Sequence, residues 1–355
     1  MKKTLFLLIA LCGTTLYTKS QEPTPTVTLT SEGLYNATTE VAGWVNLLNV
    51  DYRFDLWHEG FLELDLLAVS NLRMEQGKSG VAEGLHIFSA IEDSPSTLAL
   101  MTFGVEQRVL GDKLHLFAGI RNLGKDYFTT PWNSIFTAAV NGLFPTIATN
   151  FSVADAPNAA MALHAEWHPT PRWSTKLSIY DGVASSRWDE LFRVNLGRDG
   201  VFIIGEVAFK GEENEGYLGT YNIGATYGYA PTLAVLERGH RKKVSRASMW
   251  FLAEQPLYRA SGSRELYMIL HGAWAPQSDC DTFGSLAFVY SHLAFEGDYI
   301  GLLASRSLYR GGYETQLEVT YSLPYRYATL QPALHRVHAS HGKYTIAVVK
   351  LIVEL

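Results

Sequence analysis

The sequence predicts an all-β protein, a transmembrane antiparallel β-barrel of about 16 strands with one inward-folding constriction segment. The prediction depends on an export signal at the start of the chain, on apolar and polar residues that alternate with a period of two, and on a composition rich in aromatic residues. A chain of 355 residues that is 47% hydrophobic can bury a large core, which excludes the disordered and low-complexity classes.

The first residues have the layout of a secretory signal. Lys2 and Lys3 form a basic start, an apolar run follows over residues 4–16, and Thr18-Lys19-Ser20 is a small-x-small cleavage site. We therefore expect residues 1–20 to be a signal peptide and residues 21–355 to form a single outer-membrane barrel domain. The processed chain would keep one cysteine, Cys280, and so would have no internal disulfide.

Composition and charge narrow the function classes. Removal of Lys2, Lys3 and Lys19 changes the net charge from −6 to −9, so nucleic acid is excluded as a partner. Charged residues make up 18% of the chain, below the roughly 25% that is usual in soluble domains, and aromatic residues make up 12%. No later segment has 18 uncharged apolar residues in a row, so the chain is either periplasmic or an outer-membrane barrel.

Period-two alternation predicts the strands. In residues 114–121, Leu114 and Leu116 share one face while His115 and Arg121 share the other. The same alternation occurs in residues 161–167, 176–180, 192–196 and 344–355. A soluble sandwich would alternate as well. The repeat of about ten alternating residues between turn signals, such as Gly111-Asp112-Lys113 and Arg198-Asp199-Gly200, favours the transmembrane barrel.

Aromatic residues near the predicted strand ends suit the girdles at the two membrane interfaces, with ordinary core packing as the alternative. They are Trp167, Trp173, Trp188, Tyr258 and Trp274. The segment 122–158 interrupts the alternation and is rich in Phe, Pro, Asn and Ala. A long irregular segment of a barrel can fold into the lumen and narrow it, and an extracellular loop is the alternative. Within it, Phe128, Trp132 and Phe144 are the candidate constriction residues.

No motif for a catalytic site, cofactor or metal is found. The scattered histidines, His115 and His164 among them, are interpreted as polar residues of the lumen or interface. His335, His338 and His341 have helical spacing, but Pro332 and Gly342 bracket them, so we expect a loop and no metal site. The basic run at 240–246 is either a solvated turn or, through Lys242 and Lys243, a contact for lipid phosphates.

A series of short motifs runs along the chain in a distinctive order. They are Leu56-Trp57-His58-Glu59-Gly60, Phe88-Ser89-Ala90-Ile91-Glu92, Ala118-Gly119-Ile120-Arg121, Asp126-Tyr127-Phe128, Asn141-Gly142-Leu143-Phe144-Pro145-Thr146, Ile179-Tyr180-Asp181-Gly182, Gly219-Thr220-Tyr221-Asn222-Ile223-Gly224-Ala225, Ala253-Glu254-Gln255, Gly272-Ala273-Trp274-Ala275-Pro276 and Leu330-Gln331-Pro332. In order and spacing these motifs resemble those of the carbohydrate-selective porin (OprB) family of Gram-negative outer membranes. Asn222 stands where the family has Lys, and His335 where it has Gln.

The resemblance implies a 16-stranded porin that passes small sugars by diffusion, without a cofactor, in contact with outer-membrane lipids and lipopolysaccharide, as a monomer or a homotrimer. Charged side chains on the lipid face are costly, so the alternation itself places the charged set in the lumen. This set is Glu106, Arg108, Arg121, His164, Glu166, Lys176, Arg193 and Glu206.

We expect Arg121, Glu106 and Glu166 to line the constriction together with segment 122–158, and the alternative is that these charges only brace the wall. Two other functions stay open. One is an outer-membrane barrel enzyme of the phospholipase or protease type, which would need a nucleophile, a base and an orienting group on adjacent strands. The other is a structural barrel that does not conduct.

Overall fold

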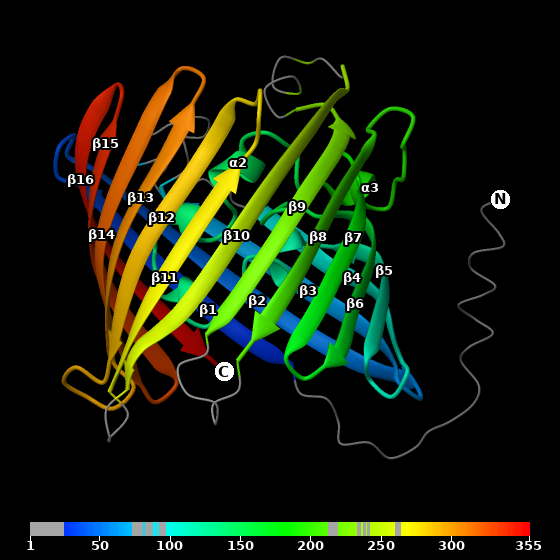
Figure 1. The fold of residues 1–355 in the computed structure, drawn as a ribbon, viewed down its shortest axis with the longest axis horizontal. Coiled ribbons are helices and arrows are strands. Elements are labelled where there is room, and N and C mark those ends of the chain that lie inside the picture. Colours follow the sequence, from blue (N-terminus) through cyan, green and yellow to red (C-terminus); the bar gives the residue numbers. More distant parts are fainter. Residues whose placement is uncertain are drawn as a thin grey trace.

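The chain forms one closed antiparallel barrel of sixteen strands within the residues that this computed structural model describes, which are 25–72, 81, 88–89, 91, 97–211, 219–232, 236, 239, 242–259 and 264–355 (Figure 1). The expected signal peptide lies outside this part. The strands are β1 (Thr26–Asn36), β2 (Val41–Trp57), β3 (Gly60–Leu72), β4 (Thr97–Val109), β5 (Leu114–Arg121), β6 (Ala160–Thr170), β7 (Trp173–Asp181), β8 (Val201–Lys210), β9 (Thr220–Ala230), β10 (Val244–Arg259), β11 (Glu265–Trp274), β12 (Cys280–Ser291), β13 (Tyr299–Tyr309), β14 (Gly312–Tyr325), β15 (Ala328–Ala339) and β16 (Gly342–Glu354).

The barrel closes where the first strand pairs with the last. Thr28 pairs with Glu354 and Asn36 with Ile346, while the other edge of β1 pairs with β2. Each strand therefore has two neighbours and the sheet has no free edge. Such closure satisfies the backbone in a bilayer, where no water is present to bond an unpaired amide. The predicted fold class is confirmed.

The two faces of the wall differ as the alternation predicts. Outward side chains such as Leu163, Ile223 and Met249 stay 59–69% exposed, whereas Ile204 and Leu252, on the inner face, are at most 1% exposed. Trp167, Trp173, Tyr258 and Trp274 lie within the first or last few residues of their strands and are about half exposed. This placement matches the aromatic girdles of outer-membrane barrels.

One predicted strand is wrong. Residues 192–196 follow the short helix α3 (Trp188–Leu191) in the connection between β7 and β8, which pair directly from Asp181 and Val201. Leu191 packs against Leu100 and Ile120 on the outer wall. Alternation over five residues does not by itself make a strand. Here β7 and β8 pair directly with each other, so no neighbouring strand was free to pair with this segment.

The expected loop at His335 and His338 is also wrong. Both residues lie in β15, where their spacing of three turns them to opposite faces. His335 is buried at 1% exposure and His338 is half-buried on the other face. Only His341 lies in the turn that follows.

The connections divide the barrel into two ends. The longest connections follow β3, β5, β7 and β9, and these strands all end toward the same end of the barrel, at the top of Figure 1. Shorter connections, such as 58–59, 110–113 and 171–172, lie at the other end together with the start of β1 and the end of β16. In outer-membrane barrels short turns face the periplasm and long loops the exterior. Among the described helices, none combines the length and apolar character that crossing a membrane requires.

Candidate functional site

The segment between β5 and β6, residues 122–159, crosses the interior of the barrel. It contains the short helices η1 (Leu123–Lys125), η2 (Asn133–Ile135), η3 (Ala139–Asn141) and α2 (Pro145–Ala148). The Tyr127 hydroxyl lies 2.8 Å from Ser178 Oγ on β7, and Gln331 on β15 donates to the Ile135 carbonyl. Since these strands lie on distant parts of a closed wall, the segment reaches both through the lumen.

Apolar packing covers one side of this segment. Phe144 is fully buried against Trp250, His271 and Phe283 of the inner wall. Phe128 packs against Trp250 with the ring centroids 4.5 Å apart and the ring planes inclined by 49°. Of the three candidate constriction residues, only Trp132 is partly exposed, and it lies against the Tyr267 ring at 4.7 Å. Phe128 and Phe144 therefore fix the segment to the wall and present little ring surface to water.

Two buried wall carboxylates hold the backbone of the segment. Glu318 on β14 accepts from the Thr137 N–H at 2.8 Å, from the Thr137 hydroxyl at 3.0 Å and from the Ala138 N–H at 3.1 Å. Glu254 on β10 accepts from the Thr130 hydroxyl at 2.5 Å and from the Trp132 N–H at 2.9 Å. These bonds satisfy amides of the segment that the barrel sheet does not pair. No sequence pattern indicates them, because the bonded residues are more than 120 positions apart in the chain.

Arg121 joins the segment to the wall at its beginning. Its guanidinium donates to both carboxylate oxygens of Asp126 at 2.6 Å and to Glu63 at 2.9 Å, and it lies over the Phe117 ring at 4.3 Å. The Arg121 side chain is only 6% exposed. Arg121 thus lies on the inner face, as the alternation predicts, but it is covered by the segment.

Glu106 and Arg108 form a second group nearer the short connections. Glu106 accepts from Arg53 at 2.7 Å and from Arg108 at 2.8 Å, and Arg53 stacks over the Phe61 ring at 3.7 Å. The Arg53 and Arg108 side chains are 34% and 26% exposed, so both reach water. Arg53 is not among the predicted lumen charges, although a lone charge between the apolar Tyr52 and Phe54 indicates an inward position in the same way.

Glu166, Lys176 and Glu206 form a third group on adjacent strands. The Lys176 ammonium lies 3.9 Å from Glu166 and 3.8 Å from Glu206, and it donates to the Asp126 carbonyl at 2.6 Å. Glu206 is buried, whereas Glu166 and Lys176 are partly exposed. The lysine therefore connects the wall charges to the crossing segment.

Arg193 does not belong to this set. It lies in the exposed connection that follows α3, and its backbone N–H bonds to the Glu190 carbonyl. The placement of Arg193 on a lumen-facing strand is wrong, because residues 192–196 form no strand.

A second segment also enters the barrel, which the sequence did not predict. The Phe88 ring meets the His335 ring edge-on at 4.5 Å, and Ser89 forms a β-bridge with Ala138 of the crossing segment. Ser89 Oγ also donates to Glu32. These residues come from the connection 73–96, most of which lies outside the described part of the chain.

Three buried imidazoles pair with hydroxyls beneath or beside the crossing segment. His164 Nδ1 lies 2.7 Å from Ser178 Oγ, and His271 and His335 make equivalent pairs with Ser285 and Thr137. His164 also lies 3.8 Å from Asp126, so a serine, a histidine and an aspartate come together on β6, β7 and the segment. Ser178 is fully buried and Asp126 is engaged by Arg121, so this trio lacks access for a substrate.

The charges that remain in contact with water come from the wall and from the segment. Arg53, Arg108 and Lys176 lie on the wall, and Lys125 extends from η1 to within 3.2 Å of Asp51 and 3.3 Å of Glu63. Although burial alone would lower the pKa of Lys125, the Glu63 and Asp51 carboxylates raise it above its ordinary value. Lys125 is therefore a fixed positive charge beside acidic neighbours.

Comparisons with known proteins bear on this architecture. The family model described as "Carbohydrate-selective porin, OprB family" matches residues 76–337. The high-pH structure of Pseudomonas putida OprB is 15% identical, with a TM-score of 0.77 over 94% of both chains. A Rhodopseudomonas blastica porin triple mutant is 9% identical, with a TM-score of 0.56 over 94% of this chain and 100% of that one. No match was found among curated proteins. At these identities the structural likenesses show the fold.

Proposed function

This chain belongs to the OprB family of carbohydrate-selective porins, and from that premise we propose that small neutral sugars pass between the crossing segment and the charged wall. The observation that supports this route is the division of the lumen. The segment packs its apolar side on the wall of β8, β10, β11 and β12, while partly exposed charges face it from β2, β4 and β7. As a porin, the protein is an outer-membrane protein, and a signal peptide at residues 1–20 would direct its export.

We propose that these charges act on sugars as hydrogen-bond partners. A neutral sugar carries both donors and acceptors, so it can exchange water for the Arg53 and Arg108 guanidinium groups and for the Glu166 carboxylate in turn. Many weak contacts of this kind allow entry without trapping the sugar.

Liposome swelling tests this function directly. We expect vesicles that contain the purified barrel to swell in isotonic monosaccharide, and to swell more slowly as the oligosaccharide lengthens, because the crossing segment limits the width of the route. Vesicles without protein are the control. The absence of swelling in any sugar would favour the structural barrel.

The enzyme alternative is tested in the same vesicles. We interpret Ser178, His164 and Asp126 as a structural hydrogen-bond group and not as a catalytic triad, since Ser178 is fully buried. Ester hydrolysis that disappears in Ser178→Ala would overturn this reading, while hydrolysis at the background rate in both proteins agrees with it.

We propose that Lys242 and Lys243 of the basic run at 240–246 contact lipopolysaccharide phosphates at the end with the long connections; residues 240–241 of the run lie outside the described part of the chain. Lys243 also donates to the Gly197 carbonyl at 2.6 Å, whereas Lys242 is exposed. The expected result of Lys242→Ala with Lys243→Ala is weaker lipopolysaccharide binding, which co-purification of the lipid with each barrel would measure. Equal lipid content, together with equal thermal stability, would contradict the proposal.

A further inference from the structure

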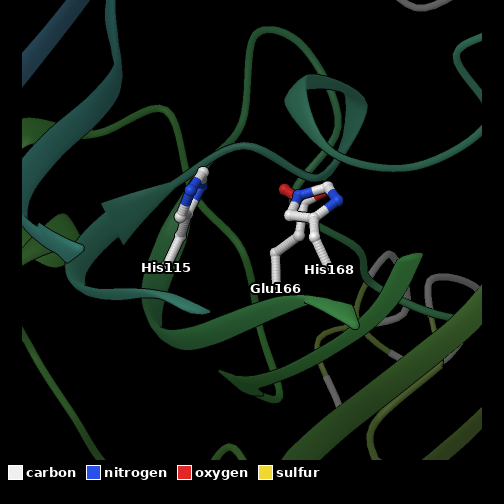
Figure 2. Close-up of side chains that lie close together, drawn as sticks. All are labelled: His115, Glu166 and His168. Carbon is white, nitrogen blue, oxygen red and sulfur yellow. The ribbon is translucent and has the colours of Figure 1, made fainter. Parts of the chain in front are cut away.

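A group of metal-ligating side chains lies at the end of the barrel with the short connections. His115 stands at the start of β5 and is the cross-strand partner of Glu166, and His168 follows two residues later on β6. Figure 2 shows His115 on one ribbon, and Glu166 and His168 on the neighbouring one, with the three side chains directed toward the same space. One ligand atom from each residue lies within 4.8 Å of the others.

The geometry of the group suits a tetrahedral metal ion. His168 Nε2 lies 3.3 Å from Glu166 Oε1. Bonds of 2.0–2.1 Å to zinc place neighbouring tetrahedral ligands about 3.3 Å apart, so this pair needs little movement. The His115 and His168 ring centroids are 5.4 Å apart. Two imidazoles and one carboxylate form a known zinc ligand set that leaves a fourth position for water.

The surroundings of the group can orient its ligands. Asp112 Oδ1 lies 3.2 Å from His115 Nε2, and carboxylates that bond to an imidazole in this way fix the orientation of the ring in metal sites. The three side chains are 20–38% exposed, so an ion can reach them from water. Among the residues that the structure describes, no other group of this kind is found.

Two cationic side chains near the group oppose the binding of a metal ion. The Lys176 ammonium lies 3.9 Å from Glu166 Oε1, and Arg108 lies 3.1 Å from Asp112. Lys176 has two further partners, the Asp126 carbonyl and Glu206, which can keep it in place when Glu166 turns to a metal. The lysine therefore lowers the affinity of the group without blocking it.

We propose that His115, Glu166 and His168 bind one divalent transition-metal ion, with Zn²⁺ as the best fit, on the inner wall at the periplasmic mouth of the channel. The bound ion adds positive charge at that mouth, so it reduces the passage of cations. The site shares Glu166 with the proposed sugar route, whereas His115 and His168 take no part in that route.

Calorimetric titration of the purified, metal-stripped full-length barrel with ZnCl₂ tests the site. We expect one Zn²⁺ per barrel, and at least tenfold weaker binding in His115→Ala, His168→Ala and Glu166→Gln. His58→Ala is the matched control, because His58 is an exposed histidine 3.8 Å from Glu59 at the same end. Far-UV circular dichroism verifies that each barrel is folded. Absence of stoichiometric Zn²⁺ binding, or full affinity in the His115→Ala/His168→Ala protein, would overturn the proposal.

A variant that binds Zn²⁺ more tightly shows that changes in affinity do not come from misfolding of the barrel. Lys176→Met removes the competing ammonium, so we expect Zn²⁺ affinity to rise several-fold. In planar bilayers, micromolar Zn²⁺ added at the side of the short connections should lower cation conductance in the wild type and leave the His115→Ala/His168→Ala channel unchanged. Unaltered affinity in Lys176→Met, or equal Zn²⁺ effects on both channels, would count against the site.

Discussion

Replacing Glu318 by alanine is expected to widen the channel and raise its single-channel conductance. The substitution removes the acceptor of three hydrogen bonds from Thr137 and Ala138. Each buried donor left without a partner costs about 1–3 kcal/mol, and these donors can regain partners only if the segment leaves the wall and meets water. We therefore expect larger oligosaccharides to enter liposomes that contain Glu318→Ala.

A matched control separates the loss of this tether from the loss of any wall carboxylate. Glu265 lies on β11, pairs with Arg259 and accepts from the Tyr267 hydroxyl, and unlike Glu318 it does not hold the segment backbone by hydrogen bonds. Glu265→Ala should leave the size limit of the pore unchanged. If a folded Glu318→Ala barrel keeps the conductance and size limit of the wild type, Glu318 does not hold the segment.

Replacing Arg121 by alanine should have the second large effect. It removes the cation of the buried Asp126 and leaves Glu63 with Lys125 alone, and breaking a buried ion pair by removing one partner costs about 3–5 kcal/mol. We expect lower thermal stability, together with altered sugar flux and conductance, because the beginning of the crossing segment loses its attachment.

Partial restoration tests this explanation. Arg121→Lys keeps one positive charge but loses the two-point contact with Asp126, so its stability and flux should fall between those of the wild type and Arg121→Ala. Joining Glu63→Gln and Asp126→Asn to Arg121→Ala removes the charges of both carboxylates that Arg121 bonded, and should recover part of the lost stability. Unchanged sugar flux and conductance in Arg121→Ala would show that Arg121 has no part in shaping the route.

The placement of Arg121 corrects the simplest view of a charged pore. The sequence predicts an inward guanidinium, and the structure has it on the inner face, but the segment covers it. Arg121, Glu254 and Glu318 are buried and bonded to the segment, Lys176 is bonded to it but partly exposed, and Arg53 and Arg108 stay in water. Charges on the lumen side of a wall are therefore not all available to a solute.

The sequence alone determined the barrel. Apolar and polar residues alternate with a period of two because each strand separates the apolar outer face of the barrel from an inner face that is wet or covered. This pattern is local, so residues 114–121 and 161–167 could be predicted as strands without knowledge of the strands beside them. The same reasoning failed at 192–196, where the pairing of Asp181 with Val201 excluded a further strand.

Tertiary structure decided what the lumen contains. The partners of the crossing segment, such as Glu318 for Thr137, are brought together only when the barrel closes, and no local pattern specifies such distant pairs. Register likewise placed His115 opposite Glu166. Local alternation predicts which face of the wall a side chain takes. Its contacts and its access to water depend on segments far away in the sequence. For that physical reason, only the folded barrel distinguishes a charge that meets water in the lumen from one that holds the crossing segment.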